Sequence, residues 1–228
     1  MNAIMQFRRD DALKSQEASI GIGAMVVFIA MVLVASIAAS VLIQTSNSLE
    51  TQAMSSGQET RDEVSSGIGV YQIIGQYGTR NISGSSVSAF HNVTIIVTSR
   101  SGGSEVDLGE VVVTISNGSK QCVVSWDNSK FASSPSSSGI FSTSGLYDLG
   151  ATSFGVIVIE DADGSCTSDA PGINEGDKIA LTFNMSASFN GIVFRDDIRG
   201  MVLPECGSPG VFLFRTPAST SRTVVELM

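Results

Sequence analysis

An uncharged apolar run, GIGAMVVFIAMVLVASIAASVLI at Gly21–Ile43, constrains this chain more than any other feature. A helix of about 20 residues crosses the hydrocarbon core of a bilayer. The run is long enough to do so and contains no proline. In lipid, a single segment satisfies its backbone polar groups only as a helix. The sequence therefore predicts a helix that can enter a membrane.

The residues before this run resemble a leader rather than an ordinary secretory signal. A secretory signal has an apolar core of about 7–15 residues and is cut behind it. Here the apolar run is longer, and small residues stand in front of it at Ala18 and Ser19. Arg8 and Arg9 favour a cytoplasmic N-terminus and an external body. We expect residues 1–18 to be cleaved off between Ala18 and Ser19. An uncleaved tail on a membrane anchor is the alternative.

Helical spacing continues past the apolar run. One face is formed by residues mostly three and four positions apart, at Leu49, Ala53, Gly57, Val64, Ile68 and Tyr71. We predict one helix from about residue 20 to residue 71, within a helical region 19–72. At 1.5 Å per residue its length is on the order of 75 Å, more than a bilayer needs. The excess length favours a helix bundle along a filament axis.

Small residues within the helix offer places where two helices can approach closely. These are Gly21, Gly23, Ala35, Ser36, Ala39 and Ser40. Ala35 with Ala39, and Ser36 with Ser40, form small-xxx-small pairs, which allow close contact between helix backbones. The helix is apolar on all sides, which suits contact with lipid and with copies of itself.

The rest of the chain has the composition of an antiparallel β domain. Short β-rich runs alternate with Gly/Ser/Asn turns, at 92–98, 110–116, 121–126, 153–160, 178–188, 191–194, 211–214 and 222–227. Apolar and polar residues alternate in Lys178–Ser188, which predicts one buried and one solvent-exposed face. We predict a linker at 73–79, an immunoglobulin-like β-sandwich at 80–228 and an exposed Ser-rich loop at 133–139. The fold class is α+β.

Four segments together resemble the archaeal flagellins, or archaellins. The longest is SIGIGAMVVFIAMVLVASIAASVLIQTSNSLETQA at Ser19–Ala53. The others are INEGDKIALTF at Ile173–Phe183, VLPECGSPG at Val202–Gly210 and VVELM at Val224–Met228. The resemblance is specific at both ends of the chain and loose in the middle. It implies a structural subunit that polymerises through its helix into an extracellular swimming filament, the archaellum.

The resemblance also implies partners. These are other copies of the chain, other archaellins, a prepilin-type leader peptidase, the export and motor machinery, and the membrane before assembly. Ala18 meets the demand of such a peptidase for a small residue, whereas Gln16-Glu17 departs from the usual basic pair. Two alternative functions remain at this stage: an adhesive type IV-like pilin, and a single-pass membrane protein with an external β domain.

Four N-x-[ST] sequons are candidate glycosylation sites, at Asn81, Asn92, Asn117 and Asn184. Asn92 and Asn184 fall on the polar phase of their predicted strands, Asn117 in a turn and Asn81 in a linker. We expect all four side chains to be exposed, as a glycan requires. The resembling family is often N-glycosylated, which favours use of at least one sequon.

A candidate Ca²⁺ site has Asp161, Asp163 and Asp169 as its ligands. The spacing departs from an EF-hand loop, so an ordinary acidic turn without a metal or other cofactor is the favoured interpretation. Cys122, Cys166 and Cys206 lack the spacing of a zinc site. They are expected either as three buried thiols or as one disulfide with one free thiol.

Composition argues against nucleic-acid binding and catalysis. The net charge is −9, whereas phosphate binding needs clustered Lys and Arg. His91 is the only histidine, no G-x-S-x-G motif occurs, and Gly21-Ile22-Gly23 lacks the Lys of a phosphate loop. A charged cluster at 195–199 is either solvated or in contact with another subunit. We therefore expect no enzymatic activity.

Overall fold

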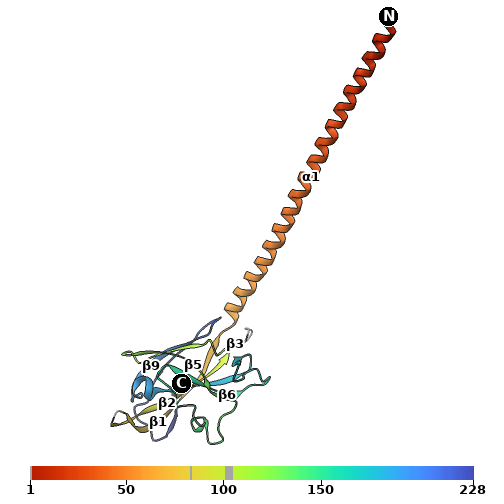
Figure 1. The fold of residues 1–228 in the computed structure, drawn as a ribbon. Helices are drawn as coiled ribbons and strands as arrows, with labels where there is room; N and C mark the ends of the chain where they lie inside the picture. Colours follow the sequence, from red (N-terminus) through yellow and green to blue (C-terminus); the bar gives the residue numbers. More distant parts are fainter. Residues whose placement is uncertain (1, 83, 101–104) are drawn as a thin grey trace. The chain divides into compact units, whose positions relative to one another are not determined.

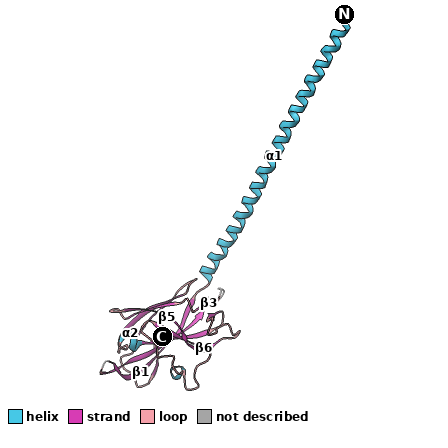
Figure 2. Cartoon of the chain, in the orientation of Figure 1, coloured by secondary structure: helices cyan, strands magenta, loops and turns pink. Residues whose placement is uncertain are grey.

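The computed structural model describes residues 2–82, 84–100 and 105–228, with side chains from Glu17 onwards. The chain divides into two compact units that meet between Gln58 and Glu59. The first unit is helical, and the second holds all the strands (Figures 1 and 2). Each unit is described by itself below.

Helix α1 (Asn2–Ser65) is continuous, as the sequence predicts for the apolar run, but it ends earlier than expected. Gly67 follows with a φ of 149°, and a Cβ there would lie 2.4 Å from the Ser208 carbonyl oxygen. Only glycine fits this close approach. Strand β1 then begins at Ile68. The predicted helix to Tyr71 and the linker at 73–79 are therefore wrong, since those residues lie in β1.

The β domain contains one nine-stranded sheet with the order β10-β9-β4-β5-β6-β8-β2-β1-β11. Its strands are β1 (Ile68–Ile82), β2 (Ser85–Ser99), β4 (Val112–Ser116), β5 (Gln121–Ala132), β6 (Ser153–Glu160), β8 (Lys178–Asn184), β9 (Asp197–Leu203), β10 (Gly210–Arg215) and β11 (Val224–Glu226). Neighbouring strands are antiparallel except β5 and β6, which are parallel. β3 (Val106–Asp107) and β7 (Gly172–Ile173) form a small second sheet.

The large sheet curls on itself. The backbone N–H of Ile68, at the start of β1, donates to the Ser208 carbonyl just before β10, at 3.1 Å. Nearly opposite ends of the strand order therefore meet. The α+β class with a long N-terminal helix and an antiparallel-rich β domain is confirmed. One curled sheet takes the place of the two separate sheets of an immunoglobulin-like sandwich.

The curled sheet encloses one main hydrophobic core, to which nearly every strand contributes. Its largest fully buried side chains include Ile68, Phe90, Ile95, Phe154, Ile179, Leu181 and Met185. The outward face of β2, β6 and β8 is covered as well, by Leu146 and Tyr147. Thr182 donates to the Leu146 carbonyl at 3.0 Å and is fully buried. The predicted solvent-exposed face of the 178–188 strand is therefore wrong.

Local differences from the sequence prediction have simple causes. Asn184 ends β8 and caps helix α2 (Met185–Phe189), so 185–188 is helical. A 3₁₀ turn η1 (Ile140–Ser142) follows the Ser-rich loop, which is mostly exposed as predicted. Residues 191–194 form only an isolated bridge between Ile192 and Phe90. The prediction missed β1 and β9.

Candidate functional site

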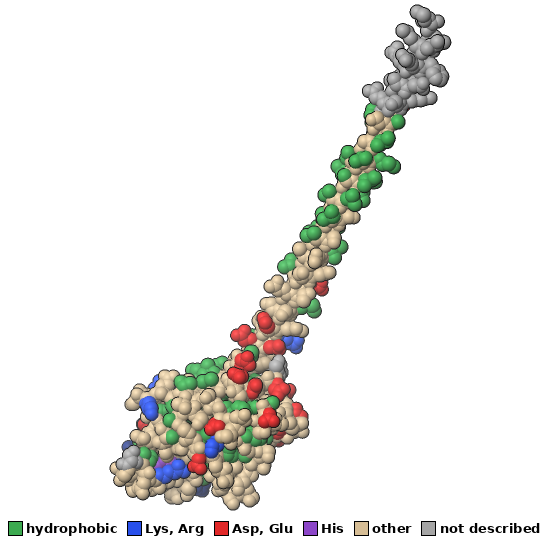
Figure 3. All heavy atoms as spheres, viewed as in Figure 1, with side chains coloured by type: hydrophobic (Ala, Val, Ile, Leu, Met, Phe, Trp, Pro, Cys, Tyr) green, Lys and Arg blue, Asp and Glu red, His purple; other side chains and the backbone are tan. Residues whose placement is uncertain are grey.

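The apolar surface of α1 is the largest unusual feature of the chain. Ile22, Val34 and Leu42 are each about two-thirds exposed, and large apolar side chains follow the helix along its length (Figure 3). Among the described residues, α1 is the one helix long and apolar enough to cross a membrane. In water such a surface is strongly unfavourable, at about 25 cal/mol per Å² of apolar area. The helix therefore needs lipid or protein around it.

The small residues predicted to support helix packing lie on this exposed surface. A Cβ at Gly21 or Gly23 would meet no atom within 4 Å apart from the helix's own backbone. No neighbouring residue in the described part of the chain therefore requires glycine at these two positions. Ala35, Ser36, Ala39 and Ser40 are likewise exposed. None of these small residues is buried by the described part of the chain.

The candidate cleavage site also lies on α1. Ala18 and Ser19 are exposed and helical, at the start of the part whose side chains are described. Arg8 and Arg9 belong to the helix, but their side chains lie outside the described residues. No acidic residue occupies the first turn and no basic residue the last turn of α1.

The four sequons lie in different environments. Asn81 is exposed and accepts a hydrogen bond from Ser86 at 2.7 Å, although Ser83 of its sequon lies outside the described residues. Asn117 is half-buried in a turn, and its side-chain oxygen accepts from the Lys120 amide at 2.9 Å. Asn81 is therefore exposed as expected, whereas Asn117 is partly covered.

The other two sequons are part of the sheet structure. Asn92 is only 2% exposed, in a row of amide side chains between Gln76 of β1 and Asn184 of β8. The expectation that Asn92 is exposed is therefore wrong. Asn184 accepts from the Ser186 amide at 3.1 Å, and its Nδ2 donates to the Leu149 carbonyl at 3.2 Å. Its amide is committed to capping α2 and holding the 140–149 segment.

A three-carboxylate cluster forms from Asp161, Asp163 and Asp177, each offering an oxygen within 4.8 Å of the others. Asp169, predicted from the sequence, does not belong to it. Asp177 is 1% exposed, and its Oδ2 accepts from the Asn174 amide at 2.9 Å. Its Oδ1 is buried and has no hydrogen-bond partner among the described residues. Burial raises the pKa of Asp177, and the charges of Asp161 and Asp163 raise it further. A bound cation would offset the unfavourable free energy of ionising the buried Asp177 carboxyl beside two other carboxylates.

The remaining candidates have structural environments. Cys122 and Cys166 are buried free thiols and Cys206 is an exposed one, so the predicted disulfide alternative is not formed. Burial raises the pKa of the Cys166 thiol to about 12, which makes it unreactive. His91 is buried, with Nδ1 2.7 Å from the Ser186 hydroxyl and Nε2 3.1 Å from the Val87 carbonyl. It helps to fix α2 against β2.

A long, exposed apolar helix followed by a β domain with its own buried core fits the class of pilin-like structural subunits. The archaeal-type flagellin family matches residues 18–214. Flagellin B2 of Methanocaldococcus jannaschii is 38% identical over 94% of this chain and 97% of its own length. Flagellin B1 of Methanococcus voltae is 33% identical over 94% of this chain and 97% of its own length. The chain therefore belongs to the archaeal-type flagellin family, whose members are structural filament proteins and not enzymes.

Solved structures agree with this assignment. The crystal structure of archaeal flagellin FlaB1 from M. jannaschii matches with a TM-score of 0.63 at 29% identity, over 71% of this chain and 96% of that one. The archaeal flagellum of Methanospirillum hungatei strain JF1 matches with a TM-score of 0.60 at 14% identity, over 90% of this chain and 98% of that one. The second match supports the fold.

Proposed function

We propose that this chain is a subunit of an extracellular archaeal flagellar filament, and that α1 serves it twice. The helix first holds the precursor in the membrane, and then packs against identical helices in the filament core. The observation that carries this proposal is the exposed apolar surface of α1 between Ile20 and Ile43, for which the described chain provides no cover. Lipid and the filament core both surround that surface with apolar groups.

The transfer from lipid to filament gains little from the hydrophobic effect. Burying one large apolar side chain is worth about 1.5–3 kcal/mol relative to water, but lipid already offers an apolar environment. Close packing at the small residues of α1, and contacts between β domains, must supply the driving force. Extraction from lipid therefore calls for an energy-driven export machine, and rotation for a motor at the filament base.

Processing fits the same sequence of events. We propose that a prepilin-type peptidase cuts between Ala18 and Ser19, which removes the charged residues before the apolar run. The exposed, small side chains at this position support access by a protease. The new N-terminus would then enter the helix bundle without the Arg8 and Arg9 charges. Other archaellins are proposed partners in the same filament.

Two modifications of the β domain are proposed from its surface. Asn81 and Asn117 are the candidate glycan acceptors, since their side chains lie at the surface whereas Asn92 is buried. Asp161, Asp163 and Asp177 are proposed to hold a divalent cation such as Ca²⁺ through carboxylate oxygens. The buried, unpartnered Oδ1 of Asp177 supports this site.

Deletion of the gene in the source organism, followed by complementation, tests the function. The proposal expects loss of sheared surface filaments and of swimming, both restored by the unaltered chain. Filaments that are lost without loss of swimming, together with loss of surface attachment, would favour an adhesive pilin. Unchanged filaments with the protein only in the membrane fraction would favour a single-pass membrane protein.

A further inference from the structure

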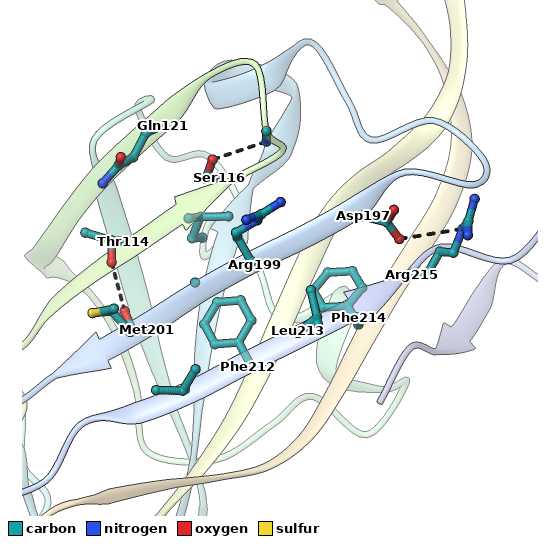
Figure 4. Close-up of a pocket in the computed structure, with 14 residues that line it drawn as sticks. Thr114, Ser116, Gln121, Asp197, Arg199, Met201, Phe212, Leu213, Phe214 and Arg215 are labelled. Carbon is teal, nitrogen blue, oxygen red and sulfur yellow. Dashed lines mark hydrogen bonds and ion pairs between the residues drawn. The ribbon is translucent and has the colours of Figure 1, made fainter.

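Residues of β4, β9 and β10, together with Gln121 of β5, line a groove with a volume of about 1110 Å³ (Figure 4). Strand register places Val123, Thr114, Met201 and Val211 in one row across the four strands. Leu213 lies in the next row, opposite Arg199. Val211 and Leu213 are 66% and 65% exposed. Val211, Leu213 and Met201 therefore form an exposed apolar strip on β9 and β10.

The other half of the same sheet has an outward face that is covered by another segment of the chain. On β2, β6 and β8 the outward residues Ile96, Ile157 and Ala180 are covered by Leu146 and Tyr147 from the 140–149 segment. No described segment of the β domain covers the outward side chains of β9 and β10 in this way. An exposed apolar patch on an extracellular domain marks an interaction surface.

The charged side chains of the groove indicate which kind of partner it can bind. Arg199 and Arg215 line the groove, and Arg215 pairs with Asp197 at 3.6 Å. Within the described part of the chain, Arg199 has no ion-pair partner. Two copies that met face to face through this groove would bring their Arg199 side chains together, which disfavours a symmetric dimer. The groove instead calls for an acidic, partly apolar partner, and a heterologous contact of this kind builds open helical assemblies.

The C-terminal part of α1 has this complementary character. Between Leu49 and Val64 it carries four acidic side chains, Glu50, Glu59, Asp62 and Glu63, against one basic side chain, Arg61. Leu49, Met54 and Val64 are 66%, 66% and 78% exposed. This segment lies beyond the apolar run Gly21–Ile43.

We propose that the β4/β9/β10 groove of one copy receives the Leu49–Val64 segment of α1 from a second copy in the filament. Leu213, Val211 and Met201 cover the apolar side chains of the helix, while Arg199, which has no ion-pair partner among the described residues, faces its carboxylates. The inference rests on the proposed filament function, because packed α1 helices bring neighbouring copies together at high effective concentration. It adds a second, outer contact to the core contact between helices.

Cysteine cross-linking between two differently tagged copies tests the contact directly. Both copies carry Cys206→Ser, which removes the exposed native thiol, and a tag in the exposed 133–139 loop. One copy carries Leu213→Cys and the other Leu49→Cys, Met54→Cys or Val64→Cys. Oxidised filaments are expected to yield a dimer with both tags for at least one α1 position. In the control, Val224→Cys, at an exposed site outside the groove, replaces Leu213→Cys. This pair should yield no dimer with both tags.

Filament yield provides a second test that needs no cross-link. Leu213→Asp places a carboxylate against the acidic helix and should lower the yield of sheared filaments at least about tenfold. Val224→Asp is the matched control and should leave the yield unchanged. The inference is overturned if mixed filaments give no specific dimer and Leu213→Asp assembles normally. If the unaltered chain forms no filaments, the proposed function itself fails.

Discussion

Large apolar side chains are exposed on α1 but buried in the β domain of the same subunit. Val34 is 67% exposed, whereas Phe154, in the centre of the sheet, is fully buried. The β domain buries its large side chains by curling one sheet around them. A single helix with apolar residues on every side cannot bury them against itself. The β domain can therefore fold by itself, while α1 is complete only in lipid or among other helices.

This difference separates assembly from folding. Substitutions in α1 should change where the protein is found and whether it polymerises, with little effect on the stability of the β domain. Substitutions in the β core should do the reverse. The predictions below test this separation, beginning with the largest expected effect.

Val34→Asp should abolish filaments. A carboxylate near the middle of an apolar helix costs about 2.5–3.5 kcal/mol in lipid, and every copy would repeat it in the filament core. Val34→Leu keeps the surface apolar and is the control. Sheared filaments are measured by electron microscopy, and β-domain unfolding of the detergent-extracted protein by Trp126 fluorescence. A lowered unfolding midpoint in Val34→Asp would contradict the expectation that substitutions in α1 leave the stability of the β domain unchanged.

Phe154→Ala should destabilise the β domain by about 3–5 kcal/mol, because it leaves a cavity at a fully buried site. Denaturant unfolding of the full chain in detergent measures this change. Val193→Ala, at a half-exposed site, is expected to remain within about 0.5 kcal/mol of the unaltered chain. Equal effects of the two substitutions would contradict the buried position of Phe154.

Ca²⁺ at about 100 times its Kd should stabilise the β domain by about 2.7 kcal/mol if the three-carboxylate site binds it. Asp177→Asn should abolish this shift. Without cation, Asp177→Asn should be more stable than the unaltered chain at neutral pH, because the folded state raises the pKa of Asp177 and disfavours its ionised form. This cost of ionisation disappears as the pH falls below that raised pKa.

Thermal melting with Ca²⁺ and with a chelator measures both effects. Asp169→Asn is the matched control, since Asp169 lies nearby in sequence but outside the cluster. An equal Ca²⁺ shift in Asp177→Asn and Asp169→Asn would remove Asp177 from the site. A destabilising effect of Asp177→Asn in chelator would contradict the cost assigned to its buried carboxylate.

The smallest effect should be the acid sensitivity that His91 gives to the β domain. Burial lowers the pKa of His91, and the nearby Arg80 charge also lowers it. The contribution to stability is present above about pH 6.5, the ordinary value, and is lost as the pH falls through the lowered pKa. His91→Gln should therefore flatten the pH dependence of melting below about pH 6.5. An unchanged slope would show that His91 does not titrate on unfolding.

The apolar run could be predicted because its length and lack of charge need no tertiary information. The end of α1 could not, since Ile68 and Tyr71 continue the helical spacing by coincidence. Pairing of β1 with β2, and the glycine-only approach at Gly67, override that local pattern. The sequence also gave no sign that Leu146 and Tyr147 cover the outward face of β8.

The candidate sites show the same limit. Asp161 and Asp163 are neighbours in sequence and were found, but Asp177 reaches them from the turn before β8. Its position two residues before Ile179, in the apolar phase of the strand, was the available signal. Asn92 follows the polar phase of its strand, yet it is buried because Gln76 and Asn184 flank it in the adjacent strands. Burial of a polar phase depends on what covers the sheet.

The central claim is that one apolar helix serves first in the membrane and then in the filament core. Mass spectrometry of the N-terminus, on protein recovered from sheared and purified surface filaments, tests it most directly. The account predicts a mature chain that begins at Ser19, immediately before the apolar run. Recovery of the protein only from membranes, with residues 1–18 intact, would contradict it.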